Sequence, residues 1–159
     1  MKVNSPHAQL FYRQGYYAGK ADDALHERKP ELETALLNQV DAAGIGITAR
    51  VNTTPGSPRG TIDIQLNLDP ATLSLRAQPG GWAGEVEEMF VQTNESGNML
   101  AKVSDKKHFE VATANRVGYD SHGVTWPMSI PLTEGATKLT IVIRDSKTEH
   151  LGSLTIPLE

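Results

Sequence analysis

The last 22 residues of the chain, Lys138 to Glu159, constrain its fold more than any other stretch. Apolar residues recur at every second position before and after a polar segment at 145–150. A period of two lines one face of a β-strand with apolar side chains. The pattern therefore predicts two strands, at about 137–145 and 151–157, joined by a polar turn and contributing to the core.

The same period recurs upstream. Ile62, Ile64, Leu66 and Leu68 alternate with polar residues, which predicts a strand with one buried and one solvated face. Further strands are expected at 45–51, 82–93, 99–103 and 124–132, with turns at 55–60, 79–81 and 94–97.

Some of these segments carry a further signal. In 82–93, Val86, Met89 and Val91 break the alternation, which suggests a β-bulge. In 124–132, two prolines favour an edge position, because proline cannot donate a hydrogen bond to a neighbouring strand. Residues 106–118 fit a short helix and an irregular crossing equally well.

The N-terminal part differs from the rest. Residues 8–17 are rich in aromatic side chains and are expected to form a strand. Pro30 suits the first position of a helix at about 30–42, in which Leu36, Leu37 and Val40 recur at helical spacing. We expect this apolar helix face to pack on the sheets or on a partner.

Together these segments predict a mainly β protein. The expected fold is an immunoglobulin-like antiparallel β-sandwich of seven or eight strands with an N-terminal helix. The predicted organisation is an aromatic strand in residues 1–18, a linker and helix in 19–44, and the sandwich in 45–159. A chain of 159 residues is long enough to bury one proper core.

Composition excludes several classes of function. A net charge of −4 with scattered Lys and Arg argues against a nucleic-acid-binding surface. The absence of cysteine excludes disulfides, thiolate metal sites and cysteine nucleophiles. No apolar run approaches the roughly 20 residues of a membrane span, and the first residues lack the apolar core of a signal peptide.

Two motifs resemble a known family. Phe11-Tyr-Arg-Gln-Gly-Tyr-Tyr-Ala18 resembles the segment that ends the von Willebrand factor A-type domain in the VWFA-related proteins of acidobacteria, where Arg-x-Gly-Tyr-Tyr-Ala recurs. Leu139-x-Ile-Val-Ile-Arg-Asp, followed by Leu-Gly-Ser-Leu-x-Ile-Pro-Leu158, resembles the closing hairpin of the same family. The likeness covers most of the chain, from about residue 3 onward.

The resemblance implies a secreted or cell-envelope protein, of which this chain would be the C-terminal region. Residues 1–18 would then be the remnant of a preceding A-type domain, and 45–159 a sandwich appended to it. The A-type domain binds a metal through an Asp-x-Ser-x-Ser loop, which this sequence lacks. The metal site of the family is therefore not carried over to any residue here.

The sequence offers no catalytic, cofactor or metal-binding set. The five histidines have no partner at metal-ligand spacing. Glu85, Glu87 and Glu88 could suggest a glycosidase pair, but Glu85 and Glu87 would share one face of a strand and Glu88 the other, as in a solvated strand. Scattered aspartates could bind calcium between loops, but no ligand spacing supports this. We therefore predict no enzyme and no cofactor.

Three aromatic residues, Trp82, Tyr119 and Trp126, are the candidate binding residues. They could form a sugar-stacking platform, although large aromatic side chains in such folds more often fill the core or its rim. The expected function is a non-catalytic protein-interaction or scaffold module, with a carbohydrate-binding module as the alternative. Loops at 53–60, 78–84 and 118–125 are the expected contact regions. The aromatic strand at 8–17 is expected to fold back on the sandwich or to form a homodimer.

Overall fold

The computed structural model describes residues 9–12, 42–54 and 60–158. The helix predicted at 30–42 lies outside these residues except for Ala42, which is not helical. Most of the aromatic segment is likewise outside, apart from a short strand at 9–12. The turn predicted at 55–60 falls almost entirely on residues that are not described.

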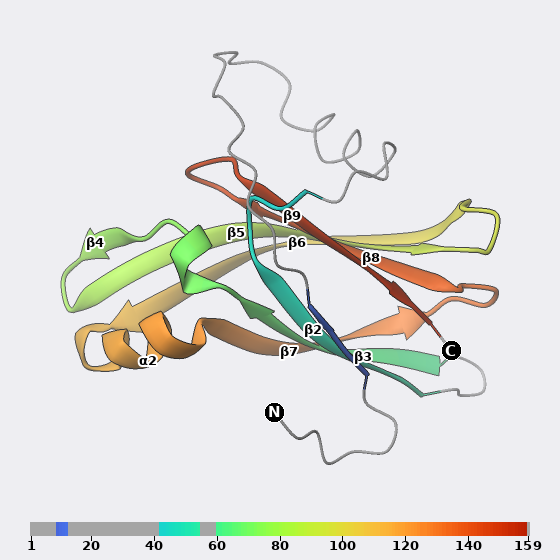
Figure 1. The fold of residues 1–159 in the computed structure, drawn as a ribbon, viewed down its shortest axis with the longest axis horizontal. Helices are drawn as coiled ribbons and strands as arrows, with labels where there is room; N and C mark the ends of the chain where they lie inside the picture. Colours follow the sequence, from blue (N-terminus) through green and yellow to red (C-terminus); the bar gives the residue numbers. More distant parts are fainter. Residues whose placement is uncertain (1–8, 13–41, 55–59, 159) are drawn as a thin grey trace.

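The first sheet has four antiparallel strands in the order β1-β2-β3-β7 (Figure 1). These are β1 (Gln9–Tyr12), β2 (Ile47–Thr54), β3 (Gly60–Leu68) and β7 (Val124–Leu132). β1 pairs with β2 along its whole length, so this strand folds back on the sandwich, which was one of the two expectations. β7 lies at an edge, as its prolines predict.

The second sheet has five antiparallel strands centred on β5. They are β4 (Arg76–Gln78), β5 (Gly81–Thr93), β6 (Met99–Ala112), β8 (Lys138–Asp145) and β9 (Leu151–Pro157). β6 pairs with one side of β5, while β4 and β8 pair with the other, and β9 lies beyond β8. The eight strands β2 to β9 agree with the predicted seven or eight over 45–159.

Three short helical segments connect these strands. η1 (Pro70–Thr72) follows β3, and η2 (Thr113–Asn115) leads into α2 (Arg116–His122) between β6 and β7. In the described residues no helix is long and apolar enough to cross a membrane.

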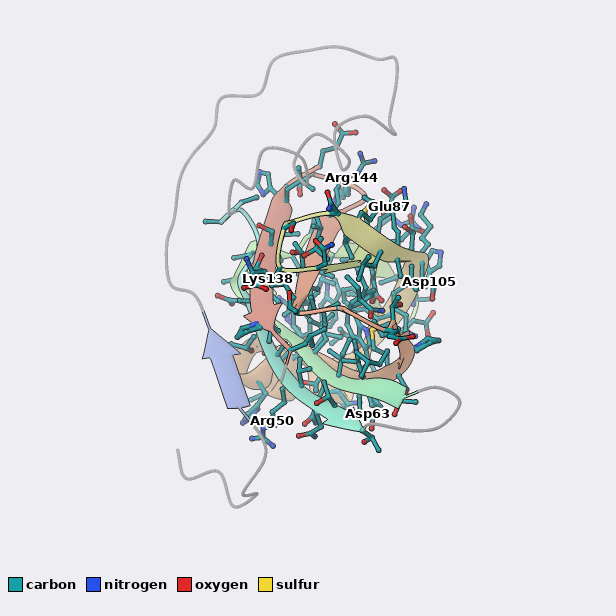
Figure 2. All side chains as sticks on the ribbon, turned by 90° about the vertical axis from the view of Figure 1, so that its right-hand side faces the viewer. Arg50, Asp63, Glu87, Asp105, Lys138 and Arg144 are labelled. Atoms are coloured by element: carbon teal, nitrogen blue, oxygen red, sulfur yellow. The ribbon has the colours of Figure 1, made fainter. Side chains whose placement is uncertain are left out.

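The core lies between the two sheets. It consists of alternating apolar residues from both, which are Ile45, Ile47, Ala49, Val51, Ile62, Ile64, Leu66, Leu68, Val86, Phe90, Trp126, Ile130, Leu139, Ile141, Ile143, Leu154 and Ile156. Figure 2 shows charged residues on the opposite outer surfaces, with Arg50 and Asp63 on one sheet and Glu87 and Arg144 on the other. Because burying one such side chain contributes roughly 1.5–3 kcal/mol, this core is the main source of stability.

The irregular pattern of β5 has a different cause from the one predicted. Val86 and Phe90 face the core, while Met89 and Val91 form a second apolar cluster with Val142 on the outer face. Burial on both faces therefore breaks the alternation. A register shift does occur in β5, but only between Gln92 and Thr93.

β6 is longer than predicted. It runs from Met99 to Ala112, so the segment 106–112 continues the strand rather than forming a helix or a crossing. Helix follows only from Thr113. Asp105 and Lys107 occupy inward positions that in a fully covered strand would be apolar, so the alternation along β6 is interrupted.

Candidate functional site

The three predicted aromatic residues gather at one end of the sandwich, around α2, which carries Tyr119. The Arg116 guanidinium carbon lies 4.7 Å from the Trp82 ring centroid and 5.6 Å from that of Tyr119. Phe109 stacks on Tyr119 at 6.5 Å and on Trp126 at 6.4 Å between centroids. The sequence predicted three of these five residues, but not the two that connect them, Phe109 and Arg116.

Two glycines make this packing possible. Gly84 lies opposite Phe109 on β5, and a Cβ at Gly84 would overlap the Phe109 ring. Gly123 ends α2 at φ 74°, and a Cβ there would overlap the Leu68 carbonyl oxygen. The left-handed conformation at Gly123 lets the chain turn from α2 into β7.

The aromatic cluster is mostly buried. Tyr119 is 6% exposed and Trp126 is 8% exposed, while Trp82 is partly exposed and covered by Arg116. Burial raises the pKa of Tyr119. A groove of about 430 Å³ runs beside the cluster, lined by Phe109, Val111, Tyr119 and Val124 among others. This arrangement packs the end of the sandwich and exposes no flat platform formed by the three rings.

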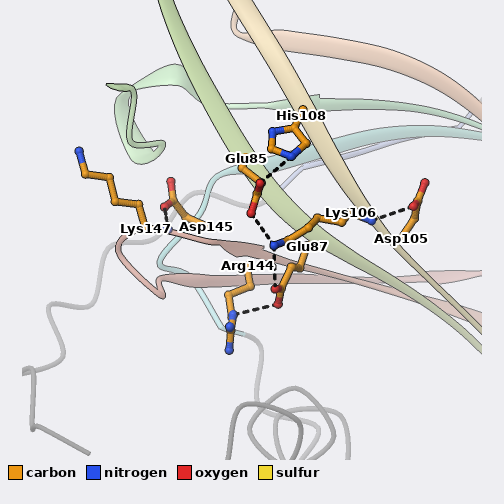
Figure 3. Close-up of polar contacts among 8 residues, drawn as sticks. All are labelled: Glu85, Glu87, Asp105, Lys106, His108, Arg144, Asp145 and Lys147. Atoms are coloured by element: carbon orange, nitrogen blue, oxygen red, sulfur yellow. Dashed lines mark hydrogen bonds and ion pairs between the residues drawn. The ribbon is translucent and has the colours of Figure 1, made fainter. Parts of the chain in front are cut away.

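A second group of side chains lies on the outer face of the five-stranded sheet (Figure 3). The Glu85 carboxylate contacts Lys106 Nζ at 2.6 Å and His108 Nε2 at 2.7 Å. Glu87 contacts Arg144 Nε at 3.2 Å and Lys106 Nζ at 3.9 Å. The hydrogen bond from Lys106 holds the pKa of Glu85 below its ordinary value.

This charged cluster lacks the geometry of an acid–base pair. Glu85 and Glu87 share one face, as predicted, and each of them forms an ion pair with a neighbouring cation. Glu88 faces the core, where burial raises its pKa. A hollow of about 270 Å³ beside Glu85 and His108 is lined also by Ser74, Arg76 and Lys147. Among the described residues, no three His, Asp or Glu side chains converge on a metal-sized site.

Asp145, the last residue of β8, holds the segment after η1 and the turn after β8 in place through hydrogen bonds. Its carboxylate accepts hydrogen bonds from Ser74 N at 2.7 Å, Lys147 N at 2.8 Å and Thr148 N at 2.9 Å. Burial acts to raise the pKa of Asp145, but these hydrogen bonds outweigh it and leave the pKa lowered. The role is structural, because Asp145 is 1% exposed.

The edges of the two sheets differ in how open they are. Pro127 and Pro131 interrupt the donors of β7. Residues 42–45 cover the start of β9: Ser153 N donates to Ala42 O at 2.9 Å, and Gly44 N donates to Leu151 O at 2.8 Å. β1 has 4 residues.

β6 presents a longer edge. It has 14 residues and no proline, and among the described residues it pairs with β5 alone. Its exposed apolar residues are Met99, Leu100 and Val103. This edge was not predicted from the sequence, because Asp105 and Lys107 interrupt the alternation of apolar and polar residues in 99–111.

No protein-family model and no curated protein matches the sequence. The interpretation of function therefore depends on the geometry described above and on the motifs of the sequence.

Proposed function

We propose that the chain is a non-catalytic protein-interaction or scaffold module built on an immunoglobulin-like sandwich. The strand order supports this fold. β2, β3 and β7 take the places of strands A, B and E, while β6, β5, β8 and β9 take those of C′, C, F and G. Sandwiches of this kind bind other proteins through exposed strand edges and end loops.

The observation that carries the proposal is the outer edge of β6, on which the described residues place no further strand. A strand edge offers a row of unpaired N–H and C=O groups, and proteins usually protect such edges with proline, short length or a covering segment. β7, β1 and β9 show these devices, whereas β6 has 14 residues, no proline and exposed side chains. We infer that a partner adds a strand at this edge.

A proline substitution at Ser104 tests the proposal. The outward-facing N–H of Ser104 would be lost, which would block strand addition without removing a bond to β5. Ser129→Pro on the β7 edge is the matched control, because Ser129 is also an exposed edge serine. Immobilised chain should capture a defined protein from lysate of the source organism, and Ser104→Pro should lose it while Ser129→Pro keeps it. Capture that is equal for both variants would reject the proposal.

We also propose that the chain is the C-terminal region of a secreted or cell-envelope VWFA-related protein. This rests on the two motifs; the second of them forms β8 and β9, whose alternation packs the core. Mass spectrometry of the endogenous protein checks this. A mass well above 17.3 kDa in the exported fraction is expected, and a mass near 17.3 kDa in the cytosol would contradict it.

The carbohydrate-binding alternative gains little from the geometry. It requires exposed, roughly coplanar aromatic rings, whereas Tyr119 and Trp126 are buried and the Trp82 ring is covered by Arg116. No other observation favours it.

A further inference from the structure

The hydrogen-bonding groups of β6 point outward at alternate residues. Glu85 O accepts from Ser146 N, and Thr93 O accepts from Thr137 N, so odd residues of β5 direct their carbonyl groups toward β8. Odd residues of β5 lie opposite even residues of β6 up to the register shift. Directly opposite residues alternate between bonded and non-bonded pairs in antiparallel sheets. The N–H and C=O groups of even residues from 102 to 110 therefore face away from β5.

Because only the even residues present outward N–H and C=O groups, two copies of β6 can pair in a limited set of registers. Even residues must lie opposite even residues, so a two-fold axis passes through a residue and never between two residues. An axis at Asp105 would place Asp105 opposite Asp105 and Lys102 opposite His108. An axis at Lys107 would place Lys107 opposite Lys107 and Lys106 opposite His108. Both registers therefore place like charges opposite each other, Asp105 on Asp105 in the first and Lys107 on Lys107 in the second.

We infer that β6 pairs antiparallel with β6 of a second copy about a two-fold axis at Lys106. This register places Lys102 opposite Glu110 and Asp105 opposite Lys107, each twice across the axis. Opposite charges at such positions contribute to pairing. The register also engages residues 100–112, nearly the whole strand.

The same register would cover two of the three exposed apolar residues of this edge, Val103 and Leu100. Val103 is 36% exposed on the inward face of β6, where the pairing would put it opposite Phe109 of the second copy. Leu100, which is 38% exposed, would lie opposite Ala112 near the end of the paired segment. The two five-stranded sheets would become one continuous sheet across the dimer.

Two features at the axis need to be accommodated. Lys106 would face Lys106 of the second copy, but Glu85 and Glu87 lie 2.6 Å and 3.9 Å from its Nζ and offset its charge. The Asp105 carboxylate accepts from Lys106 N at 2.8 Å in the single chain. Pairing transfers that N–H to the carbonyl of the facing Lys106 and frees Asp105 to contact the facing Lys107.

Charge reversal on the full chain tests the register. Lys102→Glu places two glutamates opposite each other on both sides of the axis, and Glu110→Lys does the same with two lysines. Sedimentation equilibrium should show a dimer of twice 17.3 kDa for the native chain. Each single variant should dissociate at least about tenfold more readily, the equivalent of about 1.4 kcal/mol.

The mixture of the two variants is the decisive sample. A Lys102→Glu chain and a Glu110→Lys chain are complementary to each other in this register alone, so the mixture should form a heterodimer with at least the native affinity. Far-ultraviolet circular dichroism and the melting temperature of each variant establish that both are folded. Dimers that form equally well in each variant alone, or a mixture that stays monomeric, would overturn the register.

This inference depends on the proposed open edge of β6, yet the two can fail separately. A monomeric native chain at millimolar concentration would overturn self-pairing. Capture of another protein that Ser104→Pro abolishes would then still support the interaction module. A dimer that persists in Ser104→Pro would overturn pairing through β6.

Discussion

The side chain of Asp145 accepts several structural hydrogen bonds. Its carboxylate holds Ser74, Lys147 and Thr148 through backbone hydrogen bonds of 2.7–2.9 Å in a buried position. Hydrogen bonds to a buried charge are each worth about 1.5–3 kcal/mol and are not additive. We expect Asp145→Ala to lower the free energy of unfolding by about 2–4 kcal/mol at pH 7, measured by urea denaturation.

The pH dependence of this variant follows from the lowered pKa of Asp145. A carboxyl whose folded-state pKa is depressed stabilises the protein above its unfolded value, 3.8 here, and that contribution disappears as pH falls through the folded pKa. The difference between native and variant should therefore shrink below about pH 4. Asp63→Ala, at an exposed position on β3, should stay within about 0.5 kcal/mol of the native chain.

Glu88 is the opposite case at the same scale. It is 4% exposed, and burial raises its pKa. The Trp126 indole lies near enough to lower that pKa somewhat, although its N–H does not reach hydrogen-bonding geometry. A carboxyl with a raised folded-state pKa stabilises the fold below its unfolded value of 4.5, and this is lost as pH rises through the folded pKa.

Replacing Glu88 with glutamine should therefore stabilise the protein at pH 7. The gain should be on the order of 1 kcal/mol, because glutamine removes the cost of burying an ionised carboxylate. Thermal melts from pH 4 to pH 8 measure it, and the gain should vanish at the acidic end. A variant that is less stable than the native chain at pH 7 would show that the ionised carboxylate is well accommodated.

At the scale of elements, the pairing of β5 with β6 depends on Gly84. An alanine there would displace the Phe109 ring, which stacks on Tyr119 and Trp126. We expect Gly84→Ala to cost about 1–3 kcal/mol and to shift the fluorescence of Trp126. Gly118→Ala in α2 is the control, since nothing lies within 4 Å of its Cβ position; it should be neutral or slightly stabilising.

The elements that could be predicted are those with one covered face. β3 and β9 alternate cleanly because the core removes every second side chain from water. β5 differs from its prediction because residues on both of its faces are buried. β6 was predicted too short because Asp105 and Lys107 interrupt its alternation. Of the aromatic cluster, Trp82, Tyr119 and Trp126 could be named as candidates, but only tertiary packing brings Arg116 and Phe109 between them.

For the molecule as a whole, two sheets must stay in register across the core. Apolar contacts hold them together without direction, whereas Gln92 supplies a directional link. Its Nε2 donates to Pro131 O at 2.8 Å, and its Oε1 accepts from Thr133 N at 2.8 Å. The side chain is 2% exposed, so both of its polar groups are satisfied within the protein and connect β5 to the end of β7.

Gln92 and Glu88 lie four residues apart on the inward face of β5, with Phe90 between them. Their substitutions should change the free energy of unfolding in opposite directions. Gln92→Leu leaves Pro131 O and Thr133 N without partners, each costing about 1–3 kcal/mol if water cannot reach it. We expect a loss of about 2–4 kcal/mol in unfolding free energy and faster hydrogen exchange at the Thr133 amide. If Gln92→Leu were as stable as the native chain, apolar packing alone would set how the two sheets meet.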